Sequence, residues 1–322
     1  MKLRNLLARL VRVADVVGAP LTFLTALWMK LVRGTGVQWL PMSRRILLAV
    51  GVFPVSHHYY EPLFRPGDVR MPLDRPRPLP GLDLNVEGQL AMLEQFHYND
   101  ELLEFPLHPS APLEFSYLNL SFGAGDAEVL YSMIRHFRPR RIIEIGSGNS
   151  TLMAASAIRR NHAEGSGPAC EHTCIEPYEM PWLEELGIKV IRRRVEDLGL
   201  EMFGELQAND VLFIDSSHVI RPQGDVLAEY LEILPTLKPG VIVHVHDIYT
   251  PRDYPGKRLL NEVRFWNEQY LLEAFLCLNR EFRVLAALNF LRHDHPGRLL
   301  AKCPVLAKLP DQEPGSFWMS RV

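Results

Sequence analysis

The sequence predicts a doubly wound α/β fold that follows an N-terminal extension. From residue 125 onward, short apolar stretches alternate with segments of helical periodicity, as the strands and helices of a parallel sheet do. The first apolar stretch, 141–145, runs directly into Gly146-Ser147-Gly148. Polar residues also follow the later stretches, where the carboxyl ends of parallel strands form a ligand crevice. These observations favour an open sheet with one ligand site at its edge.

The alternation predicts seven strands and the helices that connect them. Strands are expected at 141–145, 172–176, 189–193, 211–215, 241–246, 282–288 and 316–322. Helices are expected at 86–96, 126–137, 150–160, 226–237 and 260–278. Asn85 is expected to cap the first of these helices with its side chain.

Three regions are expected along the chain: N-terminal apolar and basic helices at 1–50, a proline-rich strap and helix covering the site at 51–112, and the sheet domain at 113–322. The first region suits either a core-packed helix or one lying on anionic lipid through residues 1–40. No transmembrane segment is expected, because the uncharged stretch 16–29 is short and Pro20 interrupts it. The pattern consists of apolar Leu3, Leu6, Leu7, Leu10 and Val13 with basic Lys2, Arg4, Arg9 and Arg12.

Charge and cysteine content narrow the class of protein. The chain has 35 basic and 38 acidic residues, which argues against a nucleic-acid partner. Its four scattered cysteines provide neither a disulfide framework nor a complete zinc pattern. We therefore expect a cytoplasmic protein, with the inner face of the membrane as the place where the N-terminal helices would dock. A homo-oligomer is left open.

The glycine turn predicts a nucleotide-type ligand. Gly146 and Gly148 let the backbone pass close to a ligand, and the following helix directs free N–H groups toward it. Glu144 is expected to aim its carboxylate into the same crevice. Thr151 stands where a dinucleotide fingerprint has Gly or Ala, which weakens the NAD interpretation. Glu176 ends the second strand, where a ribose would need a hydrogen-bond acceptor.

Four motifs together resemble class I S-adenosylmethionine-dependent methyltransferases, and most closely the methyltransferase 24 family. The resemblance covers roughly residues 50 to 290 and implies the Rossmann-like, seven-stranded sheet of that class. The motifs are Glu144-Ile-Gly-Ser-Gly-Asn-Ser, Cys174-Ile-Glu-Pro-Tyr, Asn209-Asp-Val-Leu-Phe-Ile-Asp-Ser-Ser-His218 and Leu237-Lys-Pro-Gly-Val-Ile-Val-His-Val-His-Asp247.

The resemblance implies S-adenosylmethionine as the cofactor. Gly146 and Gly148 would contact its methionine part, Glu176 its ribose, and Glu196 or Asp197 its adenine. The whole expected cofactor site comprises Glu144, Gly146, Ser147, Gly148, Ser150, Glu176, Glu196, Asp197 and Asp215.

A more distant similarity, to catechol and macrocin O-methyltransferases, implies a metal and a base. Asp215, His246 and Asp247 would hold a divalent cation that orients and acidifies a substrate hydroxyl. Magnesium prefers oxygen ligands, so the imidazole of His246 would suit manganese, iron or zinc better. His218 would take the hydroxyl proton, because an ordinary imidazole titrates near neutrality. Asp215, His218 and His246 are thus the expected catalytic residues; the alternative is that these histidines are hydrogen-bonded structural residues.

Aromatic and imidazole side chains are expected at the substrate. His57, His58, Tyr59 and Tyr60 stand in a row in the strap, and Trp266 lies in the helical segment after the fifth strand. The alternative for the row is that it pins the strap to the domain, and for Trp266 that it packs in the core. The acceptor is expected to be a small molecule or carbohydrate.

Three functions from different classes remain open. The first is O-methylation of a small-molecule or carbohydrate hydroxyl. The second is a non-haem iron oxygenase that uses His244, His246 and Asp247, since two histidines and a carboxylate suffice for such a centre. The third is a non-catalytic scaffold that binds S-adenosylmethionine and docks on a membrane through residues 1–40.

Overall fold

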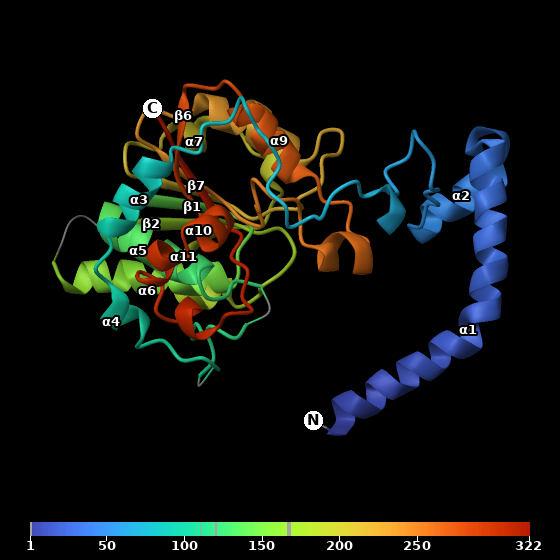
Figure 1. Cartoon of the computed structure of the whole chain (residues 1–322), viewed down its shortest axis with the longest axis horizontal. Helices are drawn as coiled ribbons and strands as arrows, with labels where there is room; N and C mark the ends of the chain where they lie inside the picture. Colours follow the sequence, from blue (N-terminus) through green and yellow to red (C-terminus); the bar gives the residue numbers. More distant parts are fainter. Residues whose placement is uncertain (1, 110, 120, 166–168) are drawn as a thin grey trace. The chain divides into compact units, whose positions relative to one another are not determined.

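The computed structural model describes residues 2–109, 111–119, 121–165 and 169–322, with the side chains of 2–6 and 8 left aside. The chain divides into two compact units, Met1–Arg70 and Met71–Val322 (Figure 1). All four cysteines carry free thiols.

The N-terminal unit is built on one long helix. α1 (Lys2–Thr35) is followed by a 3₁₀ turn (Val37–Trp39), α2 (Pro41–Val50) and a second 3₁₀ turn (Pro66–Asp68). Val32 and Leu47 are its buried apolar residues, and Arg33 Nε donates to Glu61 Oε1 at 2.7 Å. The expectation that Pro20 interrupts the helix is wrong, because α1 continues through it despite the missing N–H.

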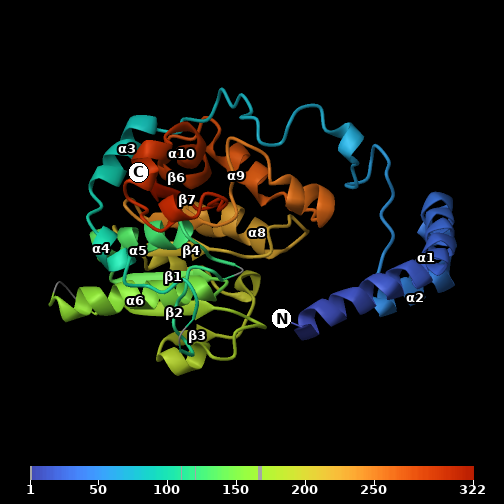
Figure 2. The same ribbon diagram turned by 60° about the horizontal axis from the view of Figure 1, so that its bottom comes forward.

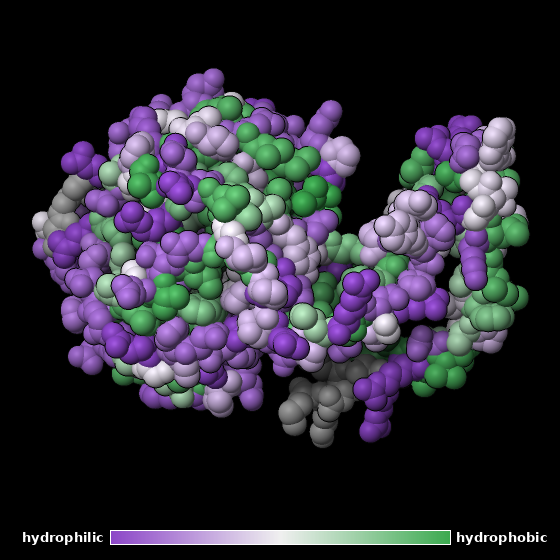
Figure 3. Space-filling view, turned by 45° about the horizontal axis from the view of Figure 1, so that its top comes forward, coloured by the Kyte–Doolittle hydropathy of each residue, from purple (hydrophilic) through white to green (hydrophobic). Residues whose placement is uncertain are grey.

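α1 is longer than the uncharged stretch 16–29, for which no transmembrane segment was expected. Within the described residues, one helix is long and apolar enough to cross a membrane, namely Arg9–Thr35. None of its most apolar window is buried within the protein. Large side chains such as Val17, Leu24 and Trp28 are at least half exposed. Figure 3 shows hydrophobic residues on the outside of this unit.

The second unit contains one seven-stranded sheet in the order β3-β2-β1-β4-β5-β7-β6. β1 to β5 run parallel to one another, and β7 is antiparallel to both of its neighbours, β5 and β6, so that β6 points the same way as the first five strands. β1 therefore lies between β2 and β4, and the strand order changes direction there, as it does at the ligand crevice of open α/β sheets. The strands are β1 (Arg141–Ile145), β2 (Glu171–Ile175), β3 (Lys189–Ile191), β4 (Val211–Ile214), β5 (Ile242–Val245), β6 (Phe282–Ala287) and β7 (Phe317–Arg321).

Helices cover both faces of the sheet. In Figure 2, α5 and α6 lie on one side of the strands, and α8 and α9 lie on the other. The fully apolar β4 is buried between these layers, with Phe213 inaccessible to solvent. The α-helices of this unit are α3 (Val86–Glu94), α4 (Asn99–Leu102), α5 (Asp126–Phe137), α6 (Asn149–Ala163), α7 (Glu201–Gly204), α8 (Asp225–Ala228), α9 (Glu268–Leu276), α10 (Leu288–Asp294) and α11 (Pro296–Leu300).

Two of the expected helices differ from the structure. The segment 226–237 divides into α8, a π-helical turn (Glu229–Ile233) and a 3₁₀ turn (Leu234–Thr236) that contains Pro235. The segment 260–278 contains only a π-helical turn (Lys257–Asn261) and α9, because residues 262–267 leave the helix. There the side chain of Asn267 accepts a hydrogen bond from the backbone of Ile220, a contact 47 residues away that periodicity does not reveal.

Asn85 is the N-cap residue of α3, as expected, but the expected capping bond from its side chain is not formed. Its backbone is left-handed, with φ 49°, and its side chain makes no capping bond to α3. Instead, Nδ2 donates to the carbonyl of Val284 in β6 at 2.8 Å. Asn85 therefore ties the start of α3 to the edge of the sheet.

Candidate active site

A cavity of ≈ 540 Å³ lies at the carboxyl ends of β1, β2 and β4. This volume is within the range of roughly 300–1,000 Å³ that small-molecule sites occupy. Among the expected cofactor residues, Gly146, Ser147, Glu176, Glu196 and Asp215 line it. Gly148, Ser150, Asp197 and Glu144 are not part of its lining.

The rim of this cavity requires a glycine at position 146. Gly146 has φ +77°, and a Cβ there would lie 1.9 Å from the carbonyl oxygen of Asp215. Its N–H donates to the carbonyl of Ile175, so the turn is fixed to β2. The close approach of two backbones is thus an internal requirement of the β1–β4 junction, whatever ligand binds beside it.

Gly148 is in a different position. Its φ of 169° is extended backbone, and a Cβ there would meet only the Cε of Met180, at 3.7 Å. Its N–H donates to Thr151 Oγ1 at 3.0 Å, so the threonine caps the start of α6. The described residues therefore leave room for a side chain at position 148.

The carboxylate of Glu144 is not directed into the cavity. Glu144 is fully buried, and Oε2 accepts from Nε2 of His172 at 2.8 Å and from Sγ of Cys174 at 3.2 Å. The parallel register pairs Glu144 with Cys174, so both side chains leave the same face of the sheet. The side chain therefore packs under the sheet face instead of at its edge.

Acidic and basic side chains form the outer wall of the cavity. Glu176 Oε1 accepts from the backbone N–H groups of Tyr178 and Glu179, which holds the loop after β2 in place. The side chain of Glu196 is mostly buried and lies 3.9 Å from the guanidinium of Arg221. Tyr178 lines the cavity with an exposed ring. Tyr178 and Arg221 were not anticipated as lining residues: Tyr178 ends the second of the four motifs but was given no role, and Arg221 lies outside all four motifs.

The three expected metal ligands lie together at one edge of the cavity. Atoms of Asp215, His246 and Asp247 that could bind a cation lie within 4.8 Å of one another. Nδ1 of His246 is 3.3 Å from Asp215 Oδ2 and, within the described residues, makes no hydrogen bond of acceptable geometry. A buried nitrogen without a partner is a place where an ion or water commonly binds. The donor set fits a divalent cation that accepts nitrogen as well as oxygen.

Charge pairing offsets burial in this cluster. Burial alone would raise the pKa of Asp215, but the neighbouring His246 and His218 hold it well below its usual range. Burial would likewise lower the pKa of His246, yet Asp215 and Asp247 raise it well above the ordinary value. Asp126 lies 3.5 Å from His246 Nε2 on the other side. The imidazole of His246 and the carboxylate of Asp215 therefore stabilise each other's charged form.

His218 lies next to the same carboxylates. Its Nε2 is 3.2 Å from Asp215 and 3.6 Å from Asp247, and its Nδ1 is 2.8 Å from Glu268. Burial would lower the pKa of His218, but the hydrogen bonds with Asp215 and Glu268 outweigh it and raise the pKa to about 10. At neutral pH the imidazole of His218 therefore keeps its proton while it is paired with Asp215 and Glu268.

Backbone conformation marks the same two positions. His218 has φ 61° and Asp247 has φ 55°, a left-handed region that costs a residue with a side chain about 1–3 kcal/mol. Asp247 Oδ1 accepts from the hydroxyl of Tyr249, which fixes its side chain. Two strained residues that face each other across one cluster are typical of functional sites.

Trp266 closes one side of the cluster. Its ring lies 4.6 Å from the ring of His218, and the guanidinium groups of Arg258 and Arg264 stack on it at 4.6 and 4.7 Å. Arg258 is also 3.5 Å from Asp247. His57, His58, Tyr59 and Tyr60 belong to the other compact unit, where His57 Nε2 lies 2.7 Å from Asp68; their substrate role stays a prediction.

His244 is not part of the cluster. Its Nε2 lies 2.8 Å from the hydroxyl of Ser316, and its ring stacks on Phe213 and packs against Trp318. Burial lowers the pKa of His244 well below the ordinary value, so the ring is neutral. It is a core residue, and the ligand set His244, His246 and Asp247 is not assembled.

Two buried carboxylates that support the site were missed. Asp126 Oδ1 accepts from the backbone N–H groups of Gly315 and Ser316, while Oδ2 faces His246. Glu268 accepts from the hydroxyl of Tyr230 as well as contacting His218. Each stands at the start of a helix, where acidic residues commonly serve the helix dipole, so the sequence held no signal to single them out.

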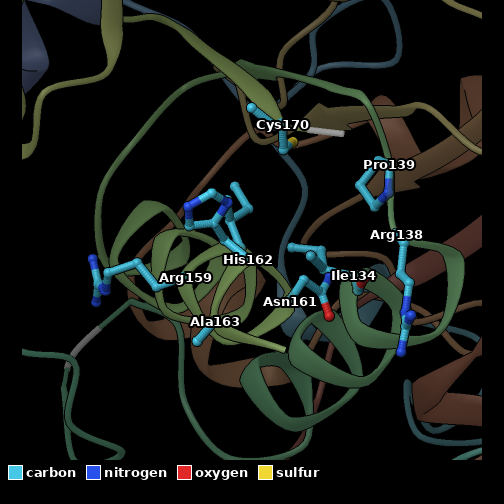
Figure 4. Close-up of a pocket in the computed structure, with 10 residues that line it drawn as sticks. Ile134, Arg138, Pro139, Arg159, Asn161, His162, Ala163 and Cys170 are labelled. Carbon is cyan, nitrogen blue, oxygen red and sulfur yellow. Dashed lines mark hydrogen bonds between the residues drawn. The ribbon is translucent and has the colours of Figure 1, made fainter. Parts of the chain in front are cut away.

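A second cavity, of ≈ 370 Å³, lies at the opposite end of the sheet domain. Figure 4 shows it between α5 and α6, with Arg159 and His162 on one side and Arg138 on the other. Cys170, just before β2, faces it from above. None of the expected site residues lines it, so the cavity at the carboxyl ends of the strands is the candidate active site.

Comparisons of the sequence with known proteins found a family and a relative. A family model described as a methyltransferase domain matches residues 143–248. A protein of Archaeoglobus fulgidus, described as uncharacterized, is 31% identical over 172 residues, which cover 49% of this chain and 75% of that protein.

Solved structures that resemble the chain include two O-methyltransferases. The enzyme TomG of Streptomyces achromogenes, involved in tomaymycin synthesis and solved with S-adenosylmethionine, has 15% identity and a TM-score of 0.36, covering 72% of this chain and 89% of that one. An O-methyltransferase of Bacillus cereus, solved with S-adenosylhomocysteine, has 13% identity and a TM-score of 0.35, covering 72% and 90%.

The strand order, in which β7 lies antiparallel between β5 and β6, together with the glycine turn after β1, defines the class I, Rossmann-like methyltransferase fold. The chain belongs to the methyltransferase 24 family of S-adenosylmethionine-dependent methyltransferases.

Proposed function

We propose that this protein transfers a methyl group from S-adenosylmethionine to a hydroxyl of a small-molecule or carbohydrate acceptor, with the help of a divalent cation. The observation that carries the proposal is the adjacency of two features at Asp215. This residue lines the glycine-rimmed cavity and also belongs to the cluster with His246 and Asp247. A donor and a polarised acceptor would thus meet at one carboxylate.

The cavity suits the methyl donor in its polarity. Gly146 leaves the rim free of side chains, and Ser147 contributes a buried hydroxyl without a hydrogen-bond partner among the described residues. Glu176 stands at the end of β2, where a ribose would find an acceptor, and Glu196 also lines the cavity. S-adenosylmethionine supplies an electrophilic methyl group on a sulfonium, which needs an in-line nucleophile. Ser150 and Asp197 remain predicted contacts.

The cluster would prepare the acceptor oxygen. Asp215, His246 and Asp247 would hold the cation, which would polarise a bound hydroxyl. His218 would hold the hydroxyl proton at Nε2. The carboxylate of Asp215 helps to keep His218 protonated. A cation bound to Asp215 would take up part of that negative charge, so the pKa of His218 would fall and Nε2 could accept the proton of the hydroxyl.

Trp266 and the arginines stacked on it would shape the acceptor site. An indole face beside a cationic rim suits a polar ring such as a sugar or a phenol. The row His57 to Tyr60 is proposed to cover the acceptor from the strap. The oxygenase alternative has no observation in its favour, since His244 is outside the cluster.

Calorimetry and product analysis test the proposal together. The purified chain should bind S-adenosylmethionine and should form S-adenosylhomocysteine when hydroxylated acceptors and a divalent cation are added. Binding without turnover across catechol, sugar and macrolide acceptors would favour the scaffold alternative. Turnover that requires iron and 2-oxoglutarate would replace the proposal by the oxygenase.

We also propose that α1 contacts a membrane. A helix of 27 residues, Arg9–Thr35, extends to about 40 Å at 1.5 Å per residue, which exceeds the roughly 30 Å of a bilayer core. Its apolar side chains lie outside the protein, where water would solvate them poorly. Basic Arg9 and Arg12 near its start would favour anionic lipid. The catalytic unit would then work at the inner face of the membrane.

A further inference from the structure

A second group of metal-ligating side chains lies beneath the glycine turn, away from the proposed acceptor site. Glu144 comes from β1, and His172 and Cys174 come from β2. The register places Glu144 opposite Cys174, and His172 precedes Cys174 by two residues, so all three leave the same sheet face. This convergence comes from two neighbouring, hydrogen-bonded strands.

The ligand atoms of the three residues lie within 4.8 Å of one another, close to the spacing of a metal centre. Nε2 of His172 is 2.8 Å from Oε2 of Glu144, and Sγ of Cys174 is 3.2 Å from that oxygen and 3.8 Å from the nitrogen. In a tetrahedral zinc centre, with bonds of about 2.0–2.3 Å, neighbouring ligand atoms are separated by about 3.3–3.5 Å. A small outward shift of the imidazole would open the required space.

The group is buried and partly unsatisfied. Glu144 and Cys174 are inaccessible to solvent, and His172 is 6% exposed. Oε1 of Glu144 and Nδ1 of His172 have no hydrogen-bond partner among the described residues, and neither has the hydroxyl of Ser147. Buried polar atoms without partners are rare and commonly indicate an ion or water.

The chemistry of the donors selects the ion. A thiolate, an imidazole and a carboxylate are the ligands of zinc sites, whereas magnesium prefers oxygen atoms alone. On binding, the thiol of Cys174 would lose its proton to solvent as the sulfur–zinc bond forms. The acceptor cluster at Asp215 has no sulfur, so the two sites would differ in metal preference.

We propose that Glu144, His172 and Cys174 form a structural zinc site that holds β1, β2 and the turn at Gly146 together. The ion would join the two strands directly under the cofactor rim. This inference does not depend on methyl transfer, and either can fail alone.

Cobalt substitution tests the site on the full-length protein. After removal of metal with a chelator, cobalt(II) chloride is titrated in, and the absorption spectrum is followed. One equivalent should produce a thiolate-to-cobalt charge-transfer band together with the intense visible bands of a tetrahedral centre. Zinc(II) chloride should abolish both bands by displacement. Binding at Asp215, His246 and Asp247 cannot give the charge-transfer band, because no sulfur lies among those ligands.

Variants assign the signal to its residues. Cys174→Ser and His172→Gln should each lose the charge-transfer band, whereas Cys303→Ser, which removes another buried thiol, should keep it. Zinc should also raise the unfolding temperature of the wild-type chain and of Cys303→Ser by more than it raises that of Cys174→Ser or His172→Gln, in which only the cluster at Asp215 can still bind it. Absence of the band in the wild-type protein would overturn the proposal without any variant, and so would its persistence in Cys174→Ser.

Discussion

Glu268 and His218 form a buried carboxylate–imidazole pair, in which Glu268 Oε2 lies 2.8 Å from Nδ1 of His218. The two residues come from different parts of the chain, His218 from the loop after β4 and Glu268 from the start of α9. The pair leaves Nε2 directed toward Asp215 and Asp247. Such a partner fixes both the orientation of an imidazole and the nitrogen that carries the mobile proton.

Replacing Glu268 by glutamine should therefore lower turnover while donor binding persists. An amide of the same size keeps the packing but loses the charge that orients and stabilises the imidazolium, for which we expect about a 10- to 100-fold loss in kcat. Steady-state kinetics and titration with S-adenosylmethionine measure the two effects. Glu232→Gln, on an exposed glutamate of the π-helical turn Glu229–Ile233, is the control. An unchanged kcat would show that Glu268 serves packing alone.

The two glycines of the turn should respond differently to alanine. At Gly146 the new Cβ would lie 1.9 Å from the carbonyl oxygen of Asp215, with φ at +77°, so Gly146→Ala should destabilise the fold by several kcal/mol, as overpacking together with a left-handed backbone would. Thermal unfolding without ligand measures this. A stable Gly146→Ala protein would mean that the β1–β4 junction can relax.

Gly148→Ala should leave the fold intact and weaken donor binding. Nothing in the described protein approaches the new methyl group closer than 3.7 Å, so the unfolding temperature should change little. The methionine part of the donor is expected at this backbone, and a methyl group there should raise the dissociation constant about tenfold or more. Calorimetric titration checks this; an unchanged affinity would place the donor elsewhere along the cavity.

Sequence reasoning predicted what depends on local pattern. The strands and the turn at Gly146 follow from apolar runs and from the need for a residue without a side chain, which neighbouring residues reveal. The direction of Glu144 follows from contact with His172 on another strand. The partnerships of Asp126 with His246 and of Glu268 with His218 join residues 50 or more positions apart. Such contacts exist only once the sheet is assembled.

Chelation should suppress methyl transfer, if a cation is held at Asp215. Excess chelator should lower activity at saturating donor by at least about 100-fold, and manganese or magnesium should restore it. Asp215→Asn should lose activity that no cation restores, whereas Asp74→Asn, on an exposed residue of the strap, should behave like wild type. Full activity in chelator would remove the cation from the mechanism. Donor binding would then have to be re-examined separately.

Low pH should weaken the hydrogen bonds that join Glu101 of α4 to Tyr131 and Arg135 of α5. Burial would raise the pKa of Glu101, but hydrogen bonds from Arg135 and Tyr131 lower it below the usual 4.5. A carboxyl group with a depressed folded-state pKa stabilises the protein above about pH 4.5, and this contribution is lost as pH falls through the folded-state pKa.

Glu101→Gln should thus cost about 1–3 kcal/mol at pH 7 and progressively less as the pH falls below 4.5. Urea unfolding at several pH values measures the difference from wild type. Glu87→Gln, on an exposed glutamate of α3, should show no such difference. A penalty that stays constant with pH would mean that the carboxylate charge contributes nothing to the join.

The full-length chain should sediment with vesicles, because α1 exposes many large apolar side chains to water. Leu24 and Val17 are 63% and 75% exposed, and neither is needed for the buried contacts of Val32 and Leu47. Replacing both by glutamate should reduce binding to anionic vesicles by at least about tenfold, since each charge costs several kcal/mol in a bilayer. Leu278→Glu, on a leucine of the catalytic unit that is 84% exposed, should bind as wild type does. Equal binding by all three proteins would show that α1 meets something other than lipid.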